Sequence, residues 1–461
     1  MQLTGENFID GAWIAGDGAP TVSENPWTGD AVLEVRSPLD RKARIRCWNA
    51  PLETRIEMLR RFAELLTERK DELTGLIRTE VGKPTWEATQ EAGACIAKIE
   101  LTIDALAERR SDVELSNGRI TYAPLGTILV IGPFNFPAHL PNGQIAPALL
   151  AGNGVIFKPS ELAPACGEFM VRTWIDAGVP PECLALVQGG GDVASDLLDI
   201  ADGVCFTGAY DTAMRISQRL ATAPHVVRMF ELGGINPIVV GRVEDVDAAA
   251  RLIVFSAFVT AGQRCTCARR LLLSPDAPPN LLERVVELSS KLTIGDPADD
   301  LFAGPLITPA AAERLLARFG ELGDPLLKPE RIGRSGLTPA IVESSRTTSE
   351  EWFGPLLKIE RCVDFDHACH RSFAPYRLSA SVLTDEATQW KHAQETMPSF
   401  GIFHHNAPTV GAAGRMPFGG HGHSGNGRPA GFFAIDACNV PIASLENPTI
   451  TPPDLRLPSD A

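Results

Sequence analysis

The sequence lacks the features of a nucleic-acid-binding or membrane-spanning protein. Its 42 Lys and Arg residues are outnumbered by 57 Asp and Glu residues, and they form no long basic block. Nucleic-acid binding needs a concentrated basic surface, so this charge balance argues against such a partner. No apolar run reaches the roughly 18 residues that span a bilayer, and the first residues, MQLTGENFIDGAW, do not resemble a signal peptide. We therefore expect a cytoplasmic protein with no membrane partner.

The common metal and nucleotide motifs are also missing. The ten cysteines show no repeating spacing and no CxxC pair, which is typical of reduced thiols that pack as small apolar residues. Cys265 and Cys267 would need further ligands to hold a zinc ion, and the scattered histidines offer them in composition only. We expect no metal. The chain also has no GxGxxG or Walker loop, so any dinucleotide site must have another design.

What is present is a long chain with two alternating patterns. At 461 residues it exceeds the size that one core usually serves, which predicts two or three units. Residues 49–107 follow a helical period, and between 127 and 240 short β-rich runs alternate with helix-length segments. A second alternation covers 246–421. These patterns predict an α/β fold with parallel sheets and a ligand crevice at the carboxyl ends of the strands.

Two polar residues stand at the ends of predicted strands where catalysis often occurs. Asn135, within Gly-Pro-Phe-Asn-Phe-Pro, is an amide on a backbone restricted by prolines, which suits donation to an oxyanion. Glu231 ends an apolar strand just before two glycines, where partial burial would raise its pKa toward that of a general base. Each residue taken alone could equally be a turn residue.

Two further loops have the chemistry of a nucleotide site. Lys158 and Glu161 follow a strand, and a carboxylate there can accept ribose hydroxyls and repel a 2′-phosphate. Residues 206–209, Phe-Thr-Gly-Ala, lead into a helix whose N–H groups could receive a pyrophosphate. In isolation, a salt-bridged surface loop is the better interpretation of the first.

Cys265 and Cys267 are separated by position rather than by periodicity. Both would lie on the same face of a strand, because they are two residues apart. Cys265 stands at the junction between a helix and a strand, where backbone N–H groups and the neighbouring Arg264 favour a thiolate. We therefore assign Cys265 as the nucleophile and Cys267 as a packing residue.

Taken together, these segments resemble the aldehyde dehydrogenase superfamily. The motifs PFNFP, FKPSE, FTGA, ELGG, AGQRC, EEWFGPLL and PFGG occur in the order of that family and cover nearly the whole chain. The stretches HLPNGQIAPALLAGN and CTCARR, with the SGN and RP elements of the tail, are similar to the succinylglutamate semialdehyde dehydrogenases of arginine catabolism.

The resemblance implies roles for individual residues. Cys265 would attack an aldehyde carbon, Asn135 and the Cys265 N–H would hold the oxyanion, and Glu231 would activate water to hydrolyse the thioester. NAD would be the cofactor, and Glu161 would favour it over NADP. The residues implied in cofactor binding are Pro133, Phe134, Lys158, Ser160, Glu161, Phe206, Thr207, Gly208, Ala209, Leu232, Gly233, Glu351 and Phe353.

The resemblance also implies an architecture and an assembly. It divides the chain into a Rossmann-type cofactor domain (1–109 and 125–233), an α/β catalytic domain (234–423) and a small β oligomerisation arm (110–124 and 433–448). A homodimer or homotetramer would follow. The implied reaction is oxidation of N-succinylglutamate semialdehyde; the alternatives are another acidic or aliphatic semialdehyde, an acylating relative or thiol hydrolase, or a binding protein that lost the chemistry.

Two departures from the family pattern bear on these expectations. Ala209 stands where the family commonly has Ser, so we expect one phosphate contact fewer and weaker cofactor binding. His404-His405-Asn406 replaces the usual Asn-Trp-Asn. These histidines could attract an anionic substrate, or they could be structural.

Overall fold

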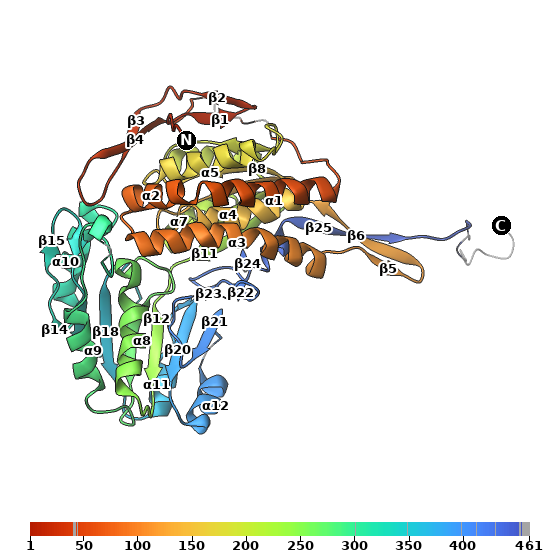
Figure 1. Cartoon of the computed structure of the whole chain (residues 1–461). Helices are drawn as coiled ribbons and strands as arrows, with labels where there is room; N and C mark the ends of the chain where they lie inside the picture. The colour runs from red at the N-terminus through yellow and green to blue at the C-terminus, as the bar shows by residue number, and fades with distance from the viewer. Residues whose placement is uncertain are drawn as a thin grey trace.

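The computed structural model describes residues 1–39, 43, 45–299, 301–347, 349–397, 399–411, 413–428, 430–450 and 453. Two seven-stranded sheets, each flanked by helices, form the body, and a separate β arm extends away from it (Figure 1). The helices are α1 (Leu52–Glu68), α2 (Lys70–Val81), α3 (Thr85–Arg109), α4 (His139–Leu150), α5 (Pro164–Asp176), α6 (Gly191–Leu197), α7 (Tyr210–Arg219), α8 (Val246–Phe258), α9 (Leu281–Ser290), α10 (Pro309–Leu322), α11 (Phe365–Arg371) and α12 (Ala387–Thr396).

The first sheet has the strand order β11-β10-β7-β8-β9-β1-β2. The five strands from β11 to β9 in this order are parallel, and the chain reverses direction across the sheet between β7 and β10. Ligand crevices in such sheets form at the carboxyl ends of the strands beside this reversal. The strands are β1 (Asn7–Ile9), β2 (Ala12–Ile14), β7 (Thr127–Ile131), β8 (Gly154–Lys158), β9 (Leu184–Leu186), β10 (Gly203–Gly208) and β11 (Val227–Leu232).

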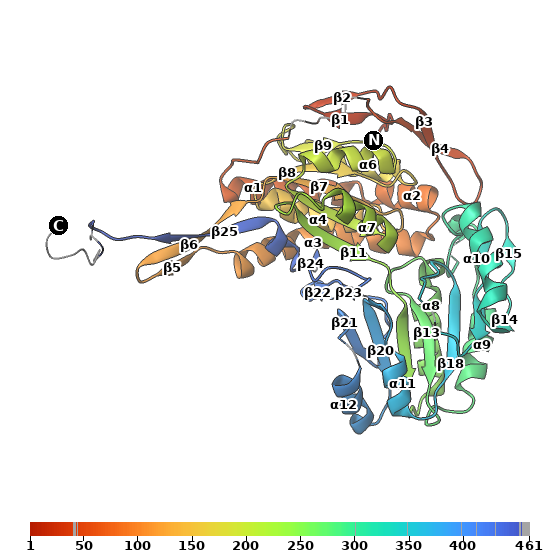
Figure 2. The same ribbon diagram turned by 180° about the vertical axis from the view of Figure 1, so that it is seen from behind.

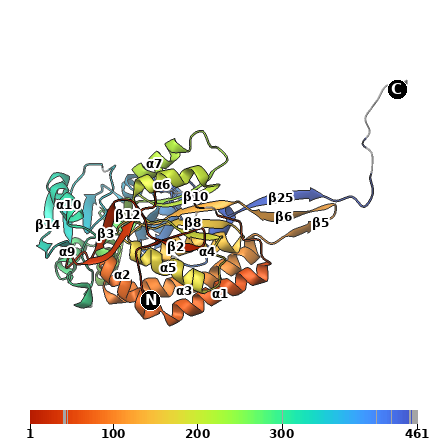
Figure 3. The same cartoon turned by 90° about the horizontal axis from the view of Figure 1, so that it is seen from above.

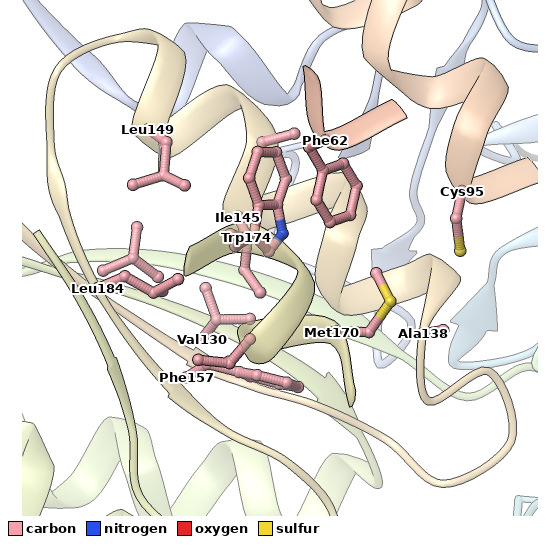
Figure 4. Packing of buried hydrophobic residues seen from close by; sticks show 14 of the residues in the cluster. Phe62, Cys95, Val130, Ala138, Ile145, Leu149, Phe157, Met170, Trp174 and Leu184 are labelled. Atoms are coloured by element: carbon pink, nitrogen blue, oxygen red, sulfur yellow. The ribbon is translucent and has the colours of Figure 1, made fainter. Parts of the chain in front are cut away.

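Helices cover this sheet on both faces, which is why its strands read as continuous apolar runs. Every residue of β8 is buried. On one face, the long helices predicted for residues 49–107 form α1, α2 and α3 and pack with α4 and α5 (Figure 1), and Figure 2 shows α6 and α7 on the other face. Phe62 of α1 stacks on Trp174 of α5 with ring centroids 3.6 Å apart, at the centre of the core drawn in Figure 4.

The second sheet has the order β14-β17-β18-β13-β12-β20-β21 and is parallel except for β14. The run NPIVVG forms β12 in this sheet, so its expected place in the first alternation was wrong. After β11, the chain passes through two glycines and crosses from the first sheet to the second. The strands are β12 (Asn236–Val240), β13 (Ala268–Leu273), β14 (Asp324–Leu327), β17 (Ala340–Glu343), β18 (Leu356–Arg361), β20 (Ser379–Leu383) and β21 (Ile402–His405).

The arm is a three-stranded antiparallel sheet, β5 (Val113–Leu115), β6 (Gly118–Pro124) and β25 (Asn439–Leu445). Residues far apart in the chain pair in it, from Asn439 opposite Pro124 to Leu445 opposite Gly118. Figure 3 shows the arm projecting well beyond the helices. The remaining short strands form four two-stranded sheets, β3-β4, β15-β16, β19-β23 and β22-β24: β3 (Pro20–Glu24), β4 (Ala31–Arg36), β15 (Arg331–Ile332), β16 (Gly336–Leu337), β19 (Tyr376–Arg377), β22 (Pro417–Phe418), β23 (His421–Gly422) and β24 (Ala430–Gly431).

Candidate active site

The segment that carries Cys265 begins with an unusual backbone turn. After α8 the chain passes through Thr260, Ala261 and Gly262 with φ values of 57°, 51° and 70°. For residues other than glycine this left-handed conformation costs about 1–2 kcal/mol each, so surrounding contacts must hold it. The turn leaves Cys265 partly exposed and Cys267 fully buried.

Arg269 holds this turn from beneath. Its side chain is fully buried, and its guanidinium donates to the carbonyl oxygens of Gly262 (2.7 Å), Arg264 (3.1 Å) and Gly354 (3.1 Å). A planar guanidinium has five donors in a fixed geometry, which suits bonding to several carbonyls at once. Sequence reasoning missed this role, although a charged residue at the start of an apolar strand was a visible signal.

Asn236 of β12 fixes the backbone at both cysteines. Its Nδ2 donates to the carbonyl oxygens of Cys265 (2.7 Å) and Cys267 (2.8 Å), and its Oδ1 accepts from the Ser379 N–H (2.9 Å). The residue is 1% exposed. All three bonds depend on an amide side chain, and no sequence motif indicated this role.

Asn135 lies against the same loop. It is buried, and its Nδ2 donates to the carbonyl oxygen of Gln263, two residues before Cys265, at 2.9 Å. Gln263 is anchored in turn, because its Oε1 accepts from the Ile307 N–H at 3.0 Å. The structure therefore brings Asn135 beside the nucleophile segment, although the two are more than a hundred residues apart in sequence.

Glu231 ends β11 as a buried carboxyl group with one free oxygen. Its Oε1 accepts from the Ala430 N–H at 3.2 Å, while its Oε2 has no hydrogen-bond partner in the described part of the chain. Burial raises the pKa of this carboxyl well above its ordinary value, because the charged form loses its hydration. A carboxyl group tuned in this way suits general acid and base chemistry.

The SGN element packs along β11 next to Glu231. The Leu232 N–H donates to the carbonyl oxygen of Ser424 (3.0 Å), and the Ser424 hydroxyl donates to that of Gly233 (2.7 Å). Asn426 accepts from the Phe230 N–H at 3.1 Å. These contacts give the motif a structural function, since they cover the free edge of β11 and fix the strand that ends in Glu231.

The two glycines after Glu231 allow close approach by the catalytic segments. A Cβ atom on Gly233 would stand 1.7 Å from Oε2 of Glu351, and one on Gly234 would stand 2.5 Å from the carbonyl oxygen of Cys265. Both distances are far below a van der Waals contact. Glycine is therefore required at both positions if these groups are to pack as they do.

The expected preference of Cys265 for the thiolate form is wrong in this structure. Burial raises the pKa of the thiol above its ordinary value, and the carboxylates of Glu351 and Glu231 raise it further. Arg264, which we expected to stabilise the thiolate, instead donates to the Thr260 hydroxyl at 2.6 Å. The thiol therefore needs a proton acceptor before it can attack a carbonyl carbon.

The residues expected to bind a cofactor lie at the carboxyl ends of the first sheet. Lys158 is almost fully buried and pairs with Glu161 at 3.4 Å, and burial lowers the pKa of its ammonium group. Ser160 is buried and accepts from the Leu162 N–H. Phe206, Thr207 and Gly208 end β10.

Ala209 is the N-cap residue of α7 and is exposed. No side chain caps the helix there, so its first N–H groups are open to an anion.

The second sheet contributes Glu351 and Phe353 to the same region. Glu351 lies 3.7 Å from the Arg269 guanidinium, and burial raises the pKa of its carboxyl. The Phe353 ring meets the Phe134 ring edge-on at 6.0 Å, which joins this loop to that of Asn135. Of the remaining expected residues, Leu232 is buried and Pro133 is half-buried in the loop after β7.

The two histidines of β21 have different surroundings. His405 stacks on Trp390 with centroids 4.5 Å apart, and its Nε2 lies 3.0 Å from the carbonyl oxygen of Thr384, which marks it as structural. His404 has a buried Nε2 without a partner among the described residues, and burial lowers its pKa. A neutral imidazole would not attract an anion by charge.

The described residues offer neither a metal site nor a membrane-spanning helix. They contain no group of three or more His, Cys, Asp or Glu side chains placed to hold a metal ion. In the same part of the chain, no helix is both long and apolar enough to cross a membrane.

Comparison with known proteins agrees with this geometry. The model of the aldehyde dehydrogenase family matches residues 40–440. The N-succinylglutamate 5-semialdehyde dehydrogenases of Paraburkholderia xenovorans (strain LB400) and Burkholderia multivorans are 42% and 41% identical, over 97% of this chain and 98% of each relative.

Solved structures show the same fold. NADP-dependent glyceraldehyde-3-phosphate dehydrogenase from Bacillus halodurans, complexed with NADP, superposes with a TM-score of 0.90 at 28% identity over 97% of this chain and all of that one. A 1-pyrroline-5-carboxylate dehydrogenase from Thermus with bound NAD gives 0.90 at 26% identity, over 96% and 92% of the two chains. The predicted fold class is confirmed. The chain belongs to the aldehyde dehydrogenase family and is an enzyme that acts on a small-molecule aldehyde.

Proposed function

We propose that this enzyme oxidises N-succinylglutamate semialdehyde to N-succinylglutamate with NAD as the cofactor. The observation that carries the proposal is the convergence of Cys265, Asn135 and Glu231 on one segment between the two sheets. The substrate is inferred from relatives of that name at 40–42% identity over nearly the whole chain. Both parts are open to test.

The first step is attack on the aldehyde. The Cys265 sulfur forms a bond to the carbonyl carbon, and its proton passes through water to solvent. The carbonyl oxygen becomes an oxyanion, which the second N–H of the Asn135 amide and the Cys265 backbone N–H are positioned to bind.

The second step releases the acid. Bound NAD would supply the hydride acceptor, and loss of a hydride from the former aldehyde carbon would leave a thioester on Cys265. Glu231 then takes a proton from water, the water oxygen bonds to the acyl carbon, and the carbon–sulfur bond breaks. Asn135 again binds the oxyanion, and the proton held by Glu231 returns to the sulfur or to solvent.

The residues at the crevice fit a dinucleotide. The uncapped N-terminus of α7 would offer N–H groups to phosphate oxygens, and Lys158 and Glu161 would form hydrogen bonds to the adenosine ribose. Glu161 is half exposed and would repel a 2′-phosphate, which favours NAD over NADP. Glu351 has a buried Oε1 without a hydrogen-bond partner among the described residues, as expected for a carboxylate that binds the nicotinamide ribose.

Nicotinamide absorbance with a panel of semialdehydes tests the proposal. We expect the highest kcat/KM with N-succinylglutamate semialdehyde and NAD, and a lower one with NADP. Equal or better turnover of another acidic or aliphatic semialdehyde would replace the substrate. Release of an acyl ester or amide instead of a free acid would favour an acylating enzyme, although Glu231 argues against one because such enzymes need no base for water.

We also propose that the arm joins subunits into a homodimer or homotetramer. It presents exposed apolar side chains on both of its long edges: Val113 (44%), Leu115 (54%), Val440 (43%), Ile442 (44%) and Leu445 (81%). A strand edge with such residues is normally paired or covered. Sedimentation of the Ile442→Lys and Leu445→Lys double variant tests this; we expect smaller assemblies, and an unchanged mass would contradict it.

The three-domain division and the cytoplasmic location stay predictions. The division is supported by the strand order, because sheet one uses residues on both sides of the arm segment 110–124. Limited proteolysis and fractionation of cells test the two.

A further inference from the structure

Lys98 of α3 carries a positive charge that no described carboxylate balances. It is half-buried and has neither an ion pair nor a side-chain hydrogen bond within the described ranges. One turn along the helix on either side stand Cys95 and Thr102, neither of which is charged. A cation held partly out of water without a counter-ion is costly, which makes such a group a candidate for ligand binding.

The side chain of Lys98 lies against α4, the helix that directly follows the Asn135 loop. Its Cε lies 3.8 Å from where a Cβ on Gly143 would stand, so it packs against the first turns of α4. His139, the first residue of α4, is close enough that Lys98 and Lys83 help burial to lower its pKa to about 3. The His139 ring in turn lies 6.5 Å from the ring of Phe136, which directly follows Asn135.

The other charged groups around Phe136 have partners, except that Oε2 of Glu87 is buried without a hydrogen-bond partner in the described part of the chain. Lys83 lies 3.4 Å above the ring centroid and pairs with Glu91 at 2.6 Å. Glu87 accepts from the Thr260 N–H at 2.9 Å, and Arg264 donates to the hydroxyl of the same Thr260. Two carboxylates therefore stand against the cations Lys83 and Arg264, and the charge of Lys98 is the excess.

His139 adds an unused polar atom to the same place. Its Nδ1 is buried and has no hydrogen-bond partner in the described part of the chain. The neutral ring can donate from this atom, so it offers a second hydrogen bond next to the Lys98 ammonium without a second charge. In a chain of net charge −15, an excess cation and a free ring nitrogen beside the catalytic loop point to an anionic ligand.

We propose that Lys98, with His139, binds a carboxylate of the substrate at the end remote from the aldehyde. The inference rests on the proposed function, which supplies an acidic semialdehyde. The two cationic alternatives are excluded on geometry, since Lys83 is paired and Arg264 bonds to the nucleophile turn. Lys98 is then a specificity residue that separates acidic from neutral aldehydes and takes no part in the chemical steps.

The test compares Lys98→Gln and Lys98→Arg with three substrates. N-succinylglutamate semialdehyde and succinic semialdehyde carry a carboxylate, and butanal matches the latter in carbon number without one. We expect Lys98→Gln to lower kcat/KM for both acids about 10- to 100-fold, through KM, as for loss of one hydrogen bond to a charged group. Butanal should change by less than about twofold, and Lys98→Arg should restore most of the loss.

Controls separate this inference from the proposed function. Lys391→Gln removes an exposed lysine on α12 and should change none of the three rates. If the wild-type enzyme prefers succinic semialdehyde but still depends on Lys98, the assigned substrate fails and the inference holds. An equal loss with butanal, no loss with the acids, or a wild-type enzyme indifferent to the carboxylate would overturn it.

Discussion

Replacement of Glu231 by Gln is the sharpest test of the proposed mechanism. The change removes only the ability to accept a proton, because the amide oxygen can still accept from the Ala430 N–H that now bonds to Oε1. The other oxygen has no partner among the described residues, so the new NH2 group displaces no existing bond. We therefore expect a folded protein.

The expected loss is confined to one step. A positioned general base contributes roughly 10²- to 10⁴-fold to a proton-transfer step. Thioester hydrolysis needs such a base to generate hydroxide character in water, whereas thiol attack has other routes for a proton. Turnover of Glu231→Gln should fall by that factor, while the first turnover of reduced nicotinamide is retained as a burst.

The pH dependence adds a second signature. Burial raises the pKa of Glu231 well above 4.5, and only the ionised form can accept a proton. The wild-type rate should therefore rise with pH through this raised pKa. The variant should lose this rising limb of its pH–rate profile. Stability should change in the opposite sense, because a carboxyl with a raised pKa stabilises the fold below its unfolded pKa and loses that contribution as pH rises.

Stopped-flow absorbance resolves the burst, and thermal unfolding across pH checks the fold. Glu351→Gln is the matched control, since it is also a buried carboxyl with a raised pKa but is proposed to contact the cofactor. It should raise the KM for NAD and leave the pH limb in place. Loss of the burst in Glu231→Gln, or an unchanged limb, would refute the assignment of the base to thioester hydrolysis.

Three other predictions follow from the same site. Cys265→Ala should abolish turnover, whereas Cys267→Ala should retain most of it and cost about 1 kcal/mol in unfolding free energy for a lost methyl-sized volume; equal losses of activity would reverse our roles. Asn236→Ala should destabilise the protein by about 2–4 kcal/mol, because it leaves two carbonyls and one N–H unbonded, and a variant of wild-type melting temperature would contradict this. Ala209→Ser should tighten the Kd of NAD severalfold and stabilise α7 by about 1 kcal/mol through a new cap, as calorimetry and thermal melts would detect; weaker NAD binding would show that the backbone N–H groups suffice.

The fold class and family were readable from sequence because their signals are local. Apolar runs of strand length mark β7, β8 and β10, and the family motifs sit in the loops that follow them. Sequence also ranked Cys265 above Cys267, and their different exposure agrees with that order. The alternation pattern alone ran on to residue 240 and so included NPIVVG, which forms β12 of the second sheet, because a strand carries no local record of its partners.

The residues that hold the active-site segments in place could not be predicted from the sequence. Arg269 and Asn236 look like ordinary strand residues, and their importance lies in carbonyl groups that reach them only after the chain folds. The direction of the Cys265 pKa was wrong for the same reason. Neighbouring residues suggested positive charge, and the folded chain supplies burial and two carboxylates instead.

The sequence by itself therefore determined which chemical groups the protein has and the order in which strands present them, because motif and periodicity are properties of contiguous residues. Only the tertiary structure decided how those groups act together. It closes Asn135 onto the loop of Cys265, covers Glu231 so that its pKa rises, and gives Lys98 no carboxylate partner among the described residues. Electrostatic strength and hydrogen-bond satisfaction depend on burial and on distant partners, and both are set only when the two sheets pack together.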